Sequence, residues 1–268
     1  EKCRNCMDSE VQVKPVLSLL VSGIRNDNWG NVYKQMLLSC DRHPFEIVFV
    51  SPYPMPADLR GLSNVQYSQD FGCPSRCLQK ASTLAQGKYI AAASDDVIIN
   101  EKEFSNCIDL LEQNDSEKDI IALKYTEGQN FNANLADFKP SYWNAHHHDS
   151  LRIPGVHPDW KICLMFMMSV ERFRGLGGLD CRFEHFNLNL HDFAFRAQRS
   201  GSKVITSDNF VTKHDWEPGR DQNNSPIIAA YYQNDLPLFN SIYGHAFTSH
   251  HRPVCIRYDN WIRQPEKW

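Results

Sequence analysis

The sequence predicts an α/β fold in which an open, mostly parallel β-sheet is flanked by helices and the second half of the chain is more elaborate than the first. Three observations support this prediction. Short apolar runs alternate with segments of helical spacing over residues 16–124, and glycines and prolines separate them. The 268 residues are 42% hydrophobic and 22% charged, as is usual for a soluble globular protein. The tight alternation of strand, helix and strand indicates βαβ units with right-handed crossovers.

The first half is expected to supply five strands and three helices. Apolar runs bounded by structure breakers predict strands over 16–21, 46–51, 64–67, 89–93 and 120–124. Helical spacing predicts helices over 29–40, 75–86 and 101–113. Asn28 is the expected N-cap of the first helix, and Gly87 the expected C-cap of the second. The first helix is expected to bury one face, formed by Trp29, Val32, Met36 and Leu37.

In the second half, regular patterning stops between about residues 125 and 160, a stretch rich in Asn, His, Pro and aromatic residues that includes His146-His147-His148. A connection of this length inside a compact domain is usually a binding loop. Order then returns with a predicted strand over 162–169, a helix near 190–200, a strand over 203–206 and a helix around 227–234. Because no low-complexity linker divides the chain, we expect a single domain over residues 1–268.

Charge and hydropathy exclude several classes of protein. The chain has 28 Lys and Arg against 32 Asp and Glu, a formal charge of −4, whereas a nucleic-acid-binding protein would be strongly basic. No apolar run approaches the roughly 20 residues that a membrane span needs. We therefore expect a cytoplasmic location. Peripheral attachment to a membrane stays open, because a chain that begins at Glu1 could have lost a tether.

The nine cysteines are too scattered, and odd in number, to form a fully paired framework within one chain. Cys3 and Cys6 form one close pair, and Cys73 and Cys77 form another. A zinc site would need a second pair at suitable spacing, and none stands near either. Ordinary thiols are expected, and a disulfide between Cys3 and Cys6 stays open.

The most informative local feature is Asp95-Asp96, which directly follows a predicted buried strand. Ligands of open α/β sheets bind outside the carboxyl ends of the strands. Two adjacent carboxylates there either repel each other or share a cation, and Mg²⁺ is commonly held by one or two carboxylates together with substrate phosphates. The dipeptide is therefore a candidate metal–phosphate site, although a capping Asp95 and a solvated Asp96 would be the plain alternative.

Several segments resemble the inverting GT-A glycosyltransferases of the family 2 type. The first is the helix, glycine, strand and acidic pair that run over residues 75–96. The others are Gly177-Gly178-Leu179-Asp180, the helix segment His191-Asp192-Phe-Ala-Phe-Arg196, and Ser200-Gly201. The resemblance covers about residues 16–216. His191 stands where these enzymes usually have Glu, and Leu78-Gln79 replaces a usual Arg-Asn pair.

The resemblance implies a GT-A fold and a metal-dependent, inverting transfer of a sugar from a UDP-sugar or another nucleoside-diphosphate sugar to an acceptor hydroxyl. It implies that Asp192, expected near the N-terminus of a helix, is the general base. It also implies that Asp95, Asp96 and His214 surround a diphosphate and its metal ion, Mn²⁺ or Mg²⁺, with Asp96 and His214 as the metal ligands.

By the same resemblance, residues 16–124 form a nucleotide-sugar-binding half and residues 125–216 an acceptor and catalytic half, between extensions over 1–15 and 217–268. The donor is expected to contact Ser22, Arg25, Ser51, Arg76, Asp95 and Asp96. The acceptor, a glycan, glycoprotein or glycolipid, is expected to contact Trp160, Gly177, Gly178 and Asp180. The glycines would let the backbone approach the sugar where a Cβ would intrude.

Two other functions share these features. A sugar-1-phosphate nucleotidyltransferase also has a nucleotide-binding α/β sheet, but the turn Ser22-Gly23-Ile-Arg25 is poorer in Gly and Lys than a typical phosphate loop. A catalytically silent carbohydrate-binding module could keep the fold without the activity. The combination of Asp95, Asp96, Asp192 and His214 favours an enzyme.

Overall fold

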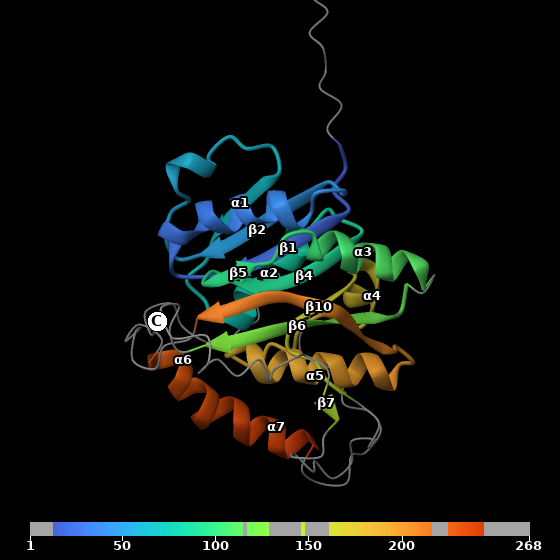
Figure 1. Ribbon diagram of the computed structural model, residues 1–268. Helices are drawn as coiled ribbons and strands as arrows, with labels where there is room; N and C mark the ends of the chain where they lie inside the picture. The colour runs from blue at the N-terminus through green and yellow to red at the C-terminus, as the bar shows by residue number, and fades with distance from the viewer. Residues whose placement is uncertain (1–12, 115–116, 129–145, 148–160, 216–224, 244–268) are drawn as a thin grey trace, which may run out of the picture.

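The computed structural model describes residues 13–114, 117–128, 146–147, 161–215 and 225–243 (Figure 1). An eight-stranded sheet has the order β3-β2-β1-β4-β9-β6-β10-β5, and β7 pairs with β8 in a separate two-stranded sheet. The strands are β1 (Leu17–Ser22), β2 (Phe45–Ser51), β3 (Val65–Gln69), β4 (Tyr89–Ser94), β5 (Val97–Ile99), β6 (Ile120–Gly128), β7 (His146–His147), β8 (Lys161–Ile162), β9 (Phe166–Ser169) and β10 (Val204–Asp215).

The sheet is mostly parallel, which confirms the predicted fold class. Strands β3, β2, β1 and β4 are joined by parallel pairings, and β6 pairs in parallel with β10. Between these two groups, β9 runs antiparallel to both β4 and β6. All six parallel strands therefore point the same way, and their C-terminal ends meet at one edge of the sheet, which we call the carboxyl edge.

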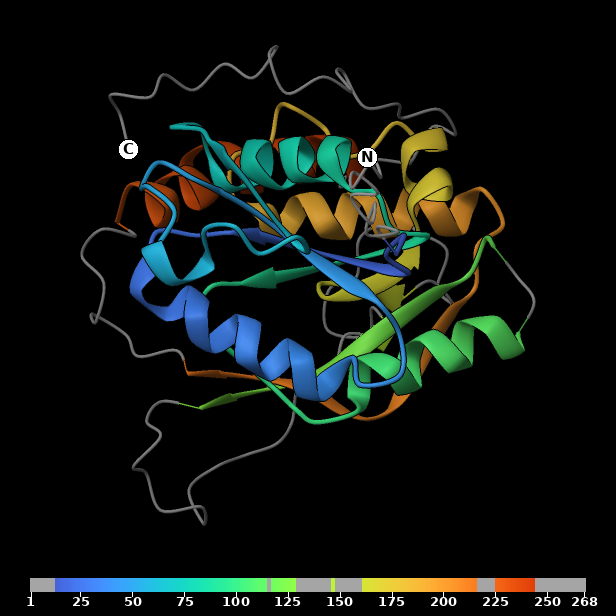
Figure 2. The same ribbon diagram turned by 90° about the horizontal axis from the view of Figure 1, so that it is seen from above.

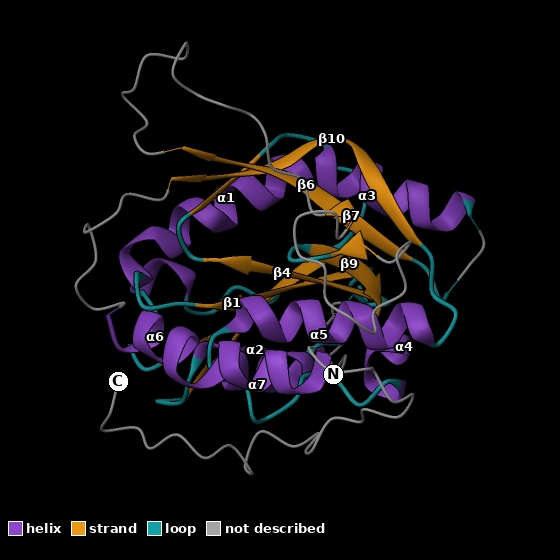
Figure 3. Cartoon of the chain, turned by 90° about the horizontal axis from the view of Figure 1, so that it is seen from below, coloured by secondary structure: helices purple, strands orange, loops and turns teal. Residues whose placement is uncertain are grey.

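Helices cover both faces of the sheet (Figures 2 and 3). One face carries α1 (Trp29–Ser39) and α3 (Glu103–Gln113), and the other carries α2 (Pro74–Leu84), α4 (Val170–Gly175), α5 (Phe186–Arg199) and α7 (Leu236–Tyr243). Short 3₁₀ turns span Asn26–Asn28 and Ala57–Leu59. Helix α6 (Ser225–Ala230) continues through a π-helical turn, Tyr231–Asp235, directly into α7.

Each helical layer closes its own hydrophobic core. Under α1, Trp29 stacks on Phe49 of β2 with ring centroids 4.3 Å apart. Under α5, Phe193 stacks on Phe166 of β9 at 5.4 Å. Trp29, Val32 and Met36 are buried as predicted. The prediction for Leu37 is wrong: it is 49% exposed, because it lies one helical step beyond Met36 and turns away from the sheet.

One predicted helix cap is confirmed in position only, and the other is wrong. Asn28 holds the N-cap position of α1, but its side chain makes no capping bond and donates instead to the Asp95 carbonyl, at 2.6 Å. Helix α2 ends at Leu84 with Ala85 as its C-cap. Gly87 lies where β4 approaches β1, and its N–H donates to Ser18 Oγ at 2.8 Å. A Cβ at Gly87 would meet the Ser18 backbone, so the glycine permits this approach rather than a helix cap.

The second half departs more from the prediction. The expected strand over 162–169 is divided between β8 and β9, α5 begins at Phe186 rather than near 190, and β10 extends as far as Asp215. The expected helix around 227–234 lies inside the longer unit α6–π–α7, while α4 and β5 were not predicted. The six cysteines within the described segments are buried free thiols, which confirms the expectation for them. No helix in the described ranges is long and apolar enough to cross a membrane.

Candidate active site

The carboxyl edge gathers polar residues that are far apart in the sequence. Ser22, at the end of β1, is level with Val50 of β2 and Ser94 of β4 in the strand register. Ser51 follows at the end of β2 and is fully buried. Asp95 and Asp96 continue from β4, and the end of β10 brings His214 to the same edge. The parallel sheet thus places the predicted donor side chains of β1, β2 and β4 at the same edge as the predicted metal ligands.

Asp95 is a buried anchor for the turn after β1. Its carboxylate is held by the Arg25 guanidinium, 2.7 Å from Oδ1, and by the Arg25 backbone N–H, which donates to Oδ2. Burial raises the pKa of Asp95, and the charge and hydrogen bonds of Arg25 oppose that rise. Gly23 lies against the same carboxylate, where a Cβ would overlap it. Asp95 therefore fixes the β1–α1 turn and is already occupied by Arg25.

Asp96 is the more available of the two acids. Its Oδ2 lies 3.8 Å from the Arg25 guanidinium, a long ion pair. Its Oδ1 is enclosed and has no hydrogen-bond partner among the described residues. An ionised oxygen buried without a donor is unfavourable unless a cation or a ligand completes it. Asp96 Oδ1, beside His214, is therefore suited to bind a divalent cation.

His214 is a buried imidazole next to this acid. Nδ1 lies 3.3 Å from Ser94 Oγ and Nε2 lies 3.4 Å from Thr212 Oγ1, while the Tyr125 ring packs edge-on at 5.4 Å. Burial lowers the pKa of His214, and the nearby charge of Asp96 opposes this effect. The ring is thus kept neutral at neutral pH, and neutral imidazole is the form that binds metals.

No group of three or more His, Cys, Asp or Glu side chains within the described ranges is arranged to hold a metal ion. A cation bound between Asp96 and His214 would therefore complete its coordination with oxygens of a ligand or water. Mg²⁺ is usually bound in this manner, by one or two carboxylates and substrate phosphates. The residues present fit a site that forms with its phosphate ligand.

Arg76 lies at the N-terminal turn of α2, also at the carboxyl edge. Its guanidinium is 2.8 Å from the buried carboxylate of Asp70, and Lys80 lies 3.1 Å from the same carboxylate. Burial raises the pKa of Asp70, but Arg76, the Gly72 N–H and Lys80 together bring it below its ordinary value. Two cations share one carboxylate, so this corner of the edge carries a net positive charge.

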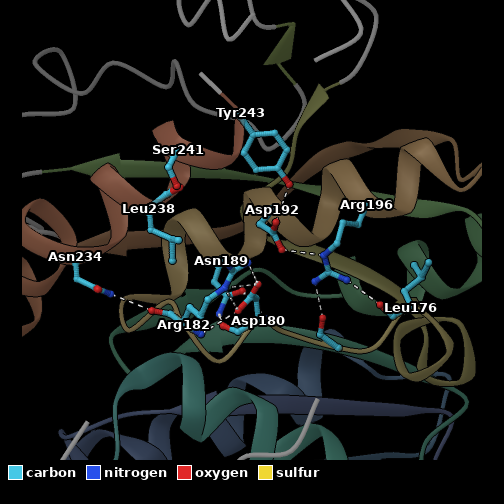
Figure 4. A network of polar contacts seen from close by, with 11 residues as sticks. Leu176, Asp180, Arg182, Asn189, Asp192, Arg196, Asn234, Leu238, Ser241 and Tyr243 are labelled. Carbon is cyan, nitrogen blue, oxygen red and sulfur yellow. Dashed lines mark hydrogen bonds and ion pairs between the residues drawn. The ribbon is translucent and has the colours of Figure 1, made fainter. Parts of the chain in front are cut away.

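Asp192 lies on α5, and the expectation about its place in the helix is wrong. It is the seventh residue of α5, so it does not lie near the helix N-terminus. Its side chain is fully buried: Arg196 donates to Oδ2 at 2.9 Å and Tyr243 Oη donates to Oδ1 at 2.6 Å (Figure 4). A general base must come within hydrogen-bond reach of the acceptor proton. The structure does not support Asp192 in that role, because Arg196 and Tyr243 occupy its oxygens and no solvent reaches it.

Of the predicted acceptor residues in the loop after α4, Gly178 and Asp180 are buried and Gly177 is partly exposed. Gly177 and Gly178 have φ of 87° and 64°, the left-handed region that favours glycine. Arg196 donates to the Gly178 carbonyl at 2.6 Å, and a Cβ on Gly178 would meet Gln79. The structure thus accounts for Gly178 by its approach to α2. No contact with a sugar needs to be invoked.

Asp180 is fully buried and forms an ion pair with Arg182 at 2.7 Å (Figure 4). Its backbone N–H and carbonyl are held by the Asn189 side chain, each at 3.0 Å. These contacts fix the loop from within. Trp160, the remaining predicted acceptor residue, lies outside the described residues.

Sequence reasoning missed two parts of this region. Asp70 was not predicted as a site residue, although it follows β3 at the carboxyl edge and forms ion pairs with both Arg76 and Lys80. The Asp192–Arg196 ion pair was also missed, although an acid four residues before an arginine on one helix is a recognisable signal of such a pair.

The structural comparisons identify the fold. S. aureus TarS 1–349, solved in complex with UDP-GlcNAc, is similar over 87% of this chain and 72% of its own, with a TM-score of 0.52 and 16% identity. GalNAc-T7, solved with UDP, GalNAc and Mn²⁺, is similar over 87% of this chain and 49% of its own, with a TM-score of 0.59 and 12% identity. The chain has the fold of the GT-A glycosyltransferases. The sequence matches no protein-family model and no curated protein.

At 12% and 16% identity, these similarities establish the GT-A fold of the chain and leave its chemistry to be argued from its own residues. The chain spans only about half of GalNAc-T7, so the similarity concerns one part of that protein. The chemistry of the site depends on the residues at the carboxyl edge: Arg25, Asp95, Asp96 and His214.

Proposed function

We propose that this chain is a metal-dependent glycosyltransferase that moves a sugar from a nucleoside-diphosphate sugar to an acceptor hydroxyl. One observation carries the proposal: the enclosed, unpartnered Oδ1 of Asp96 lies at the carboxyl edge beside the neutral imidazole of His214. The UDP-GlcNAc bound to TarS and the UDP and Mn²⁺ bound to GalNAc-T7 support a UDP-sugar donor and Mn²⁺, with Mg²⁺ as the other candidate.

In this proposal Asp96 and His214 hold the divalent ion, and residues 16–124 hold the donor. A bound Mn²⁺ or Mg²⁺ supplies Lewis-acid stabilisation of the negative charge on the departing diphosphate. Asp95 does not bind this ion, because it holds Arg25 in place at the end of β1. Ser22 offers a hydroxyl at the same edge, and Arg76 adds positive charge where α2 begins. Ser51 lies at this edge as well, but its side chain is fully buried and accepts the Tyr53 N–H.

The acceptor side is proposed to lie in residues 125–216, with the acceptor hydroxyl attacking from the face opposite the diphosphate. That geometry inverts the anomeric centre, as the sequence resemblance implies. The acceptor proton must pass to a base other than Asp192, whose oxygens are held by Arg196 and Tyr243.

A thermal-shift panel of nucleotide sugars, measured with Mn²⁺ and with EDTA, tests the donor half of the proposal. Binding to the native state raises its stability, by about 2.7 kcal/mol when the ligand is present at 100 times its Kd. We expect UDP-sugars to raise Tm in Mn²⁺ and to lose this effect in EDTA. Hydrolysis of the stabilising donor, followed by NMR of the released sugar, would report turnover and its anomeric outcome.

Two alternative functions give different results in the same experiments. A silent carbohydrate-binding module would show no turnover of any donor. A sugar-1-phosphate nucleotidyltransferase would release pyrophosphate from a nucleoside triphosphate and a sugar phosphate. Either result would overturn the proposal.

A further inference from the structure

Four neutral aromatic rings form a continuous row between the start of α5 and the π-helical turn Tyr231–Asp235. His185 stacks on Phe186 at 5.0 Å, Tyr231 meets His185 edge-on at 5.5 Å, and Tyr232 meets Tyr231 edge-on at 5.1 Å. We call Phe186, His185, Tyr231 and Tyr232 the aromatic row. Tyr232 closes it on the outside and is 63% exposed.

The aromatic row lies at the carboxyl edge. Helix α5 leads into β10, which starts at the opposite edge, so α5 must begin at the carboxyl edge. The Ser75 N–H, at the start of α2, donates to the Glu184 carbonyl at 3.2 Å, which joins the row to the helix that carries Arg76. Figures 1 and 3 show α6, which leads into the π-helical turn, on the side of the molecule toward which the C-terminal ends of β6 and β10 point.

The row is held rigidly by a buried acid. Asp235, in the same π-helical turn as the two tyrosines, is fully buried. It accepts the N–H of Glu184 at 3.0 Å and the N–H of His185 at 2.7 Å. These two bonds join the turn to the start of α5, so the rings from the two segments keep a fixed relative position before any ligand arrives. Fixing contact groups in advance lowers the entropic cost of binding.

The row carries no positive charge. Residues 183–192 and 225–235 contain no Lys or Arg, and the guanidinium of nearby Arg182 is bound to Asp180. His185 Nδ1 accepts the Asn187 N–H at 3.1 Å, which leaves the ring proton on Nε2 and the ring neutral. The cations of the adjoining helix α2, Arg76 and Lys80, are both held by the Asp70 carboxylate. The row's own segments therefore offer no countercharge to a phosphorylated or sulfated acceptor. The polar atoms of the row are the two tyrosine hydroxyls and an imidazole N–H.

We propose that the aromatic row is the binding site for a neutral carbohydrate acceptor, with Tyr232 stacking on the apolar face of one sugar ring. Aromatic rings with polar tips suit a ligand that has both apolar ring faces and hydroxyl groups. The inference rests on the proposed function, because it assigns the acceptor of that same site. A π-helical turn is often found at functional sites, in keeping with this assignment.

Binding of oligosaccharides to the full chain, without any donor, tests this site separately from catalysis. The probes are neutral chitotetraose, cellotetraose and maltotetraose, with an anionic heparin tetrasaccharide for comparison, measured by saturation-transfer NMR and calorimetry. We expect at least one neutral probe to bind, Tyr232→Ala to weaken it about tenfold, and Tyr232→Phe to restore most of the loss. Tyr232 is largely exposed, so its truncation should leave the fold intact, as circular dichroism would verify.

Leu38→Ala is the matched control, because Leu38 is a 53% exposed apolar residue at the C-terminal end of α1, away from the carboxyl edge. It should bind like the wild type. The proposal is overturned if no neutral probe binds, if Tyr232→Ala binds as tightly as the wild type, or if the heparin tetrasaccharide binds best. A wild type that binds a neutral probe but turns over no nucleotide sugar would refute the proposed enzyme and leave the carbohydrate site standing.

Discussion

Ser94 and His214 are separated by 120 residues in the chain, yet Ser94 Oγ lies 3.3 Å from His214 Nδ1. The contact joins the end of β4 to the end of β10 across the carboxyl edge, although β9 and β6 lie between these strands in the sheet. Because Asp95 and Asp96 follow Ser94 directly, the contact also places the imidazole within electrostatic reach of Asp96. The pairing of β5 with β10, in which Val97 is opposite His214, brings the Asp95-Asp96 turn to the end of β10 and so builds the metal-binding part of the proposed site.

Replacing Asp96 with Ala is expected to weaken the Mn²⁺-dependent binding of UDP by about tenfold to a hundredfold, because the variant loses an enclosed carboxylate oxygen that has no hydrogen-bond partner among the described residues. Titration calorimetry with UDP, in Mn²⁺ and in EDTA, measures the effect. Asp41→Ala is the control: Asp41 also lies beside an arginine, Arg42, but follows the C-terminal end of α1. An unchanged UDP affinity in Asp96→Ala would remove Asp96 from the metal site.

Replacing Asp192 with Asn is expected to destabilise the protein by about 3–5 kcal/mol, since it leaves the buried guanidinium of Arg196 without its charge partner. Tyr243→Phe removes only the second contact and should cost about 1–3 kcal/mol. Urea unfolding of the three proteins measures both losses. If Asp192→Asn kept the stability of the wild type and lost only sugar transfer, Asp192 would be the general base after all.

The fold was largely predictable because buried strands and amphipathic helices leave periodic patterns in the sequence. All five strands and three helices expected in the first half are present, with ends that shift by a few residues. The direction of a strand in the sheet leaves no such pattern in the sequence. A run such as Phe166–Ser169 is equally apolar whether its strand runs parallel or antiparallel, so the reversed β9 was not foreseen. The bulges of β10 near Ser207 and Val211 likewise interrupted the pattern and hid its full length.

The candidate site was predictable in part, for a related reason. Asp95-Asp96 directly follows a readable strand, and strand ends in a parallel sheet converge, so their position at the edge followed from the pattern. Asp192 lies inside a helix, where position along the sequence does not reveal whether a side chain faces the site or the core. Its partner Tyr243 comes from α7, 51 residues further on, and only the packing of α7 on α5 shows that the carboxylate is enclosed.

Replacing Gly23 with Ala is expected to weaken UDP binding and to destabilise the fold by about 1–3 kcal/mol, because the new methyl group would overlap the Asp95 carboxylate and push it away from Arg25. Gly175→Ala is the matched control. Its Cβ would point into open space at the end of α4, so the change should be neutral or slightly stabilising. Thermal unfolding and UDP titration compare the two. If the two variants had the same Tm and the same affinity for UDP, the Asp95 carboxylate could move without loss of stability or of UDP binding.

Two titratable groups of this region, His185 in the aromatic row and Asp235 behind it, should give the protein opposite responses to pH. Burial lowers the pKa of His185 to about 4, and burial raises the pKa of Asp235 to about 6 against its three hydrogen bonds. Between pH 4 and 6.5 the unfolded chain binds more protons at His185 than the native state does, so this group adds stability as the pH rises. At Asp235 the native state binds more protons between pH 4 and 6, so this group removes stability over that range.

Single substitutions should separate these responses. As the pH rises from 4 to 6.5, the wild type gains stability from the deprotonation of His185, and His185→Asn does not. The stability of the variant should therefore fall by about 3 kcal/mol relative to that of the wild type over this range. Relative to the wild type, Asp235→Asn is expected to gain a similar amount between pH 4 and 6, because it lacks the destabilising contribution of Asp235. Asn can still accept the helix-capping hydrogen bond at residue 185. Urea unfolding of each protein at pH 4, 5, 6 and 6.5 measures the slopes. If the stabilities of the two variants, each relative to the wild type, changed with pH in the same direction, the two pKa shifts could not both be present. The burial that causes these shifts would then be contradicted as well.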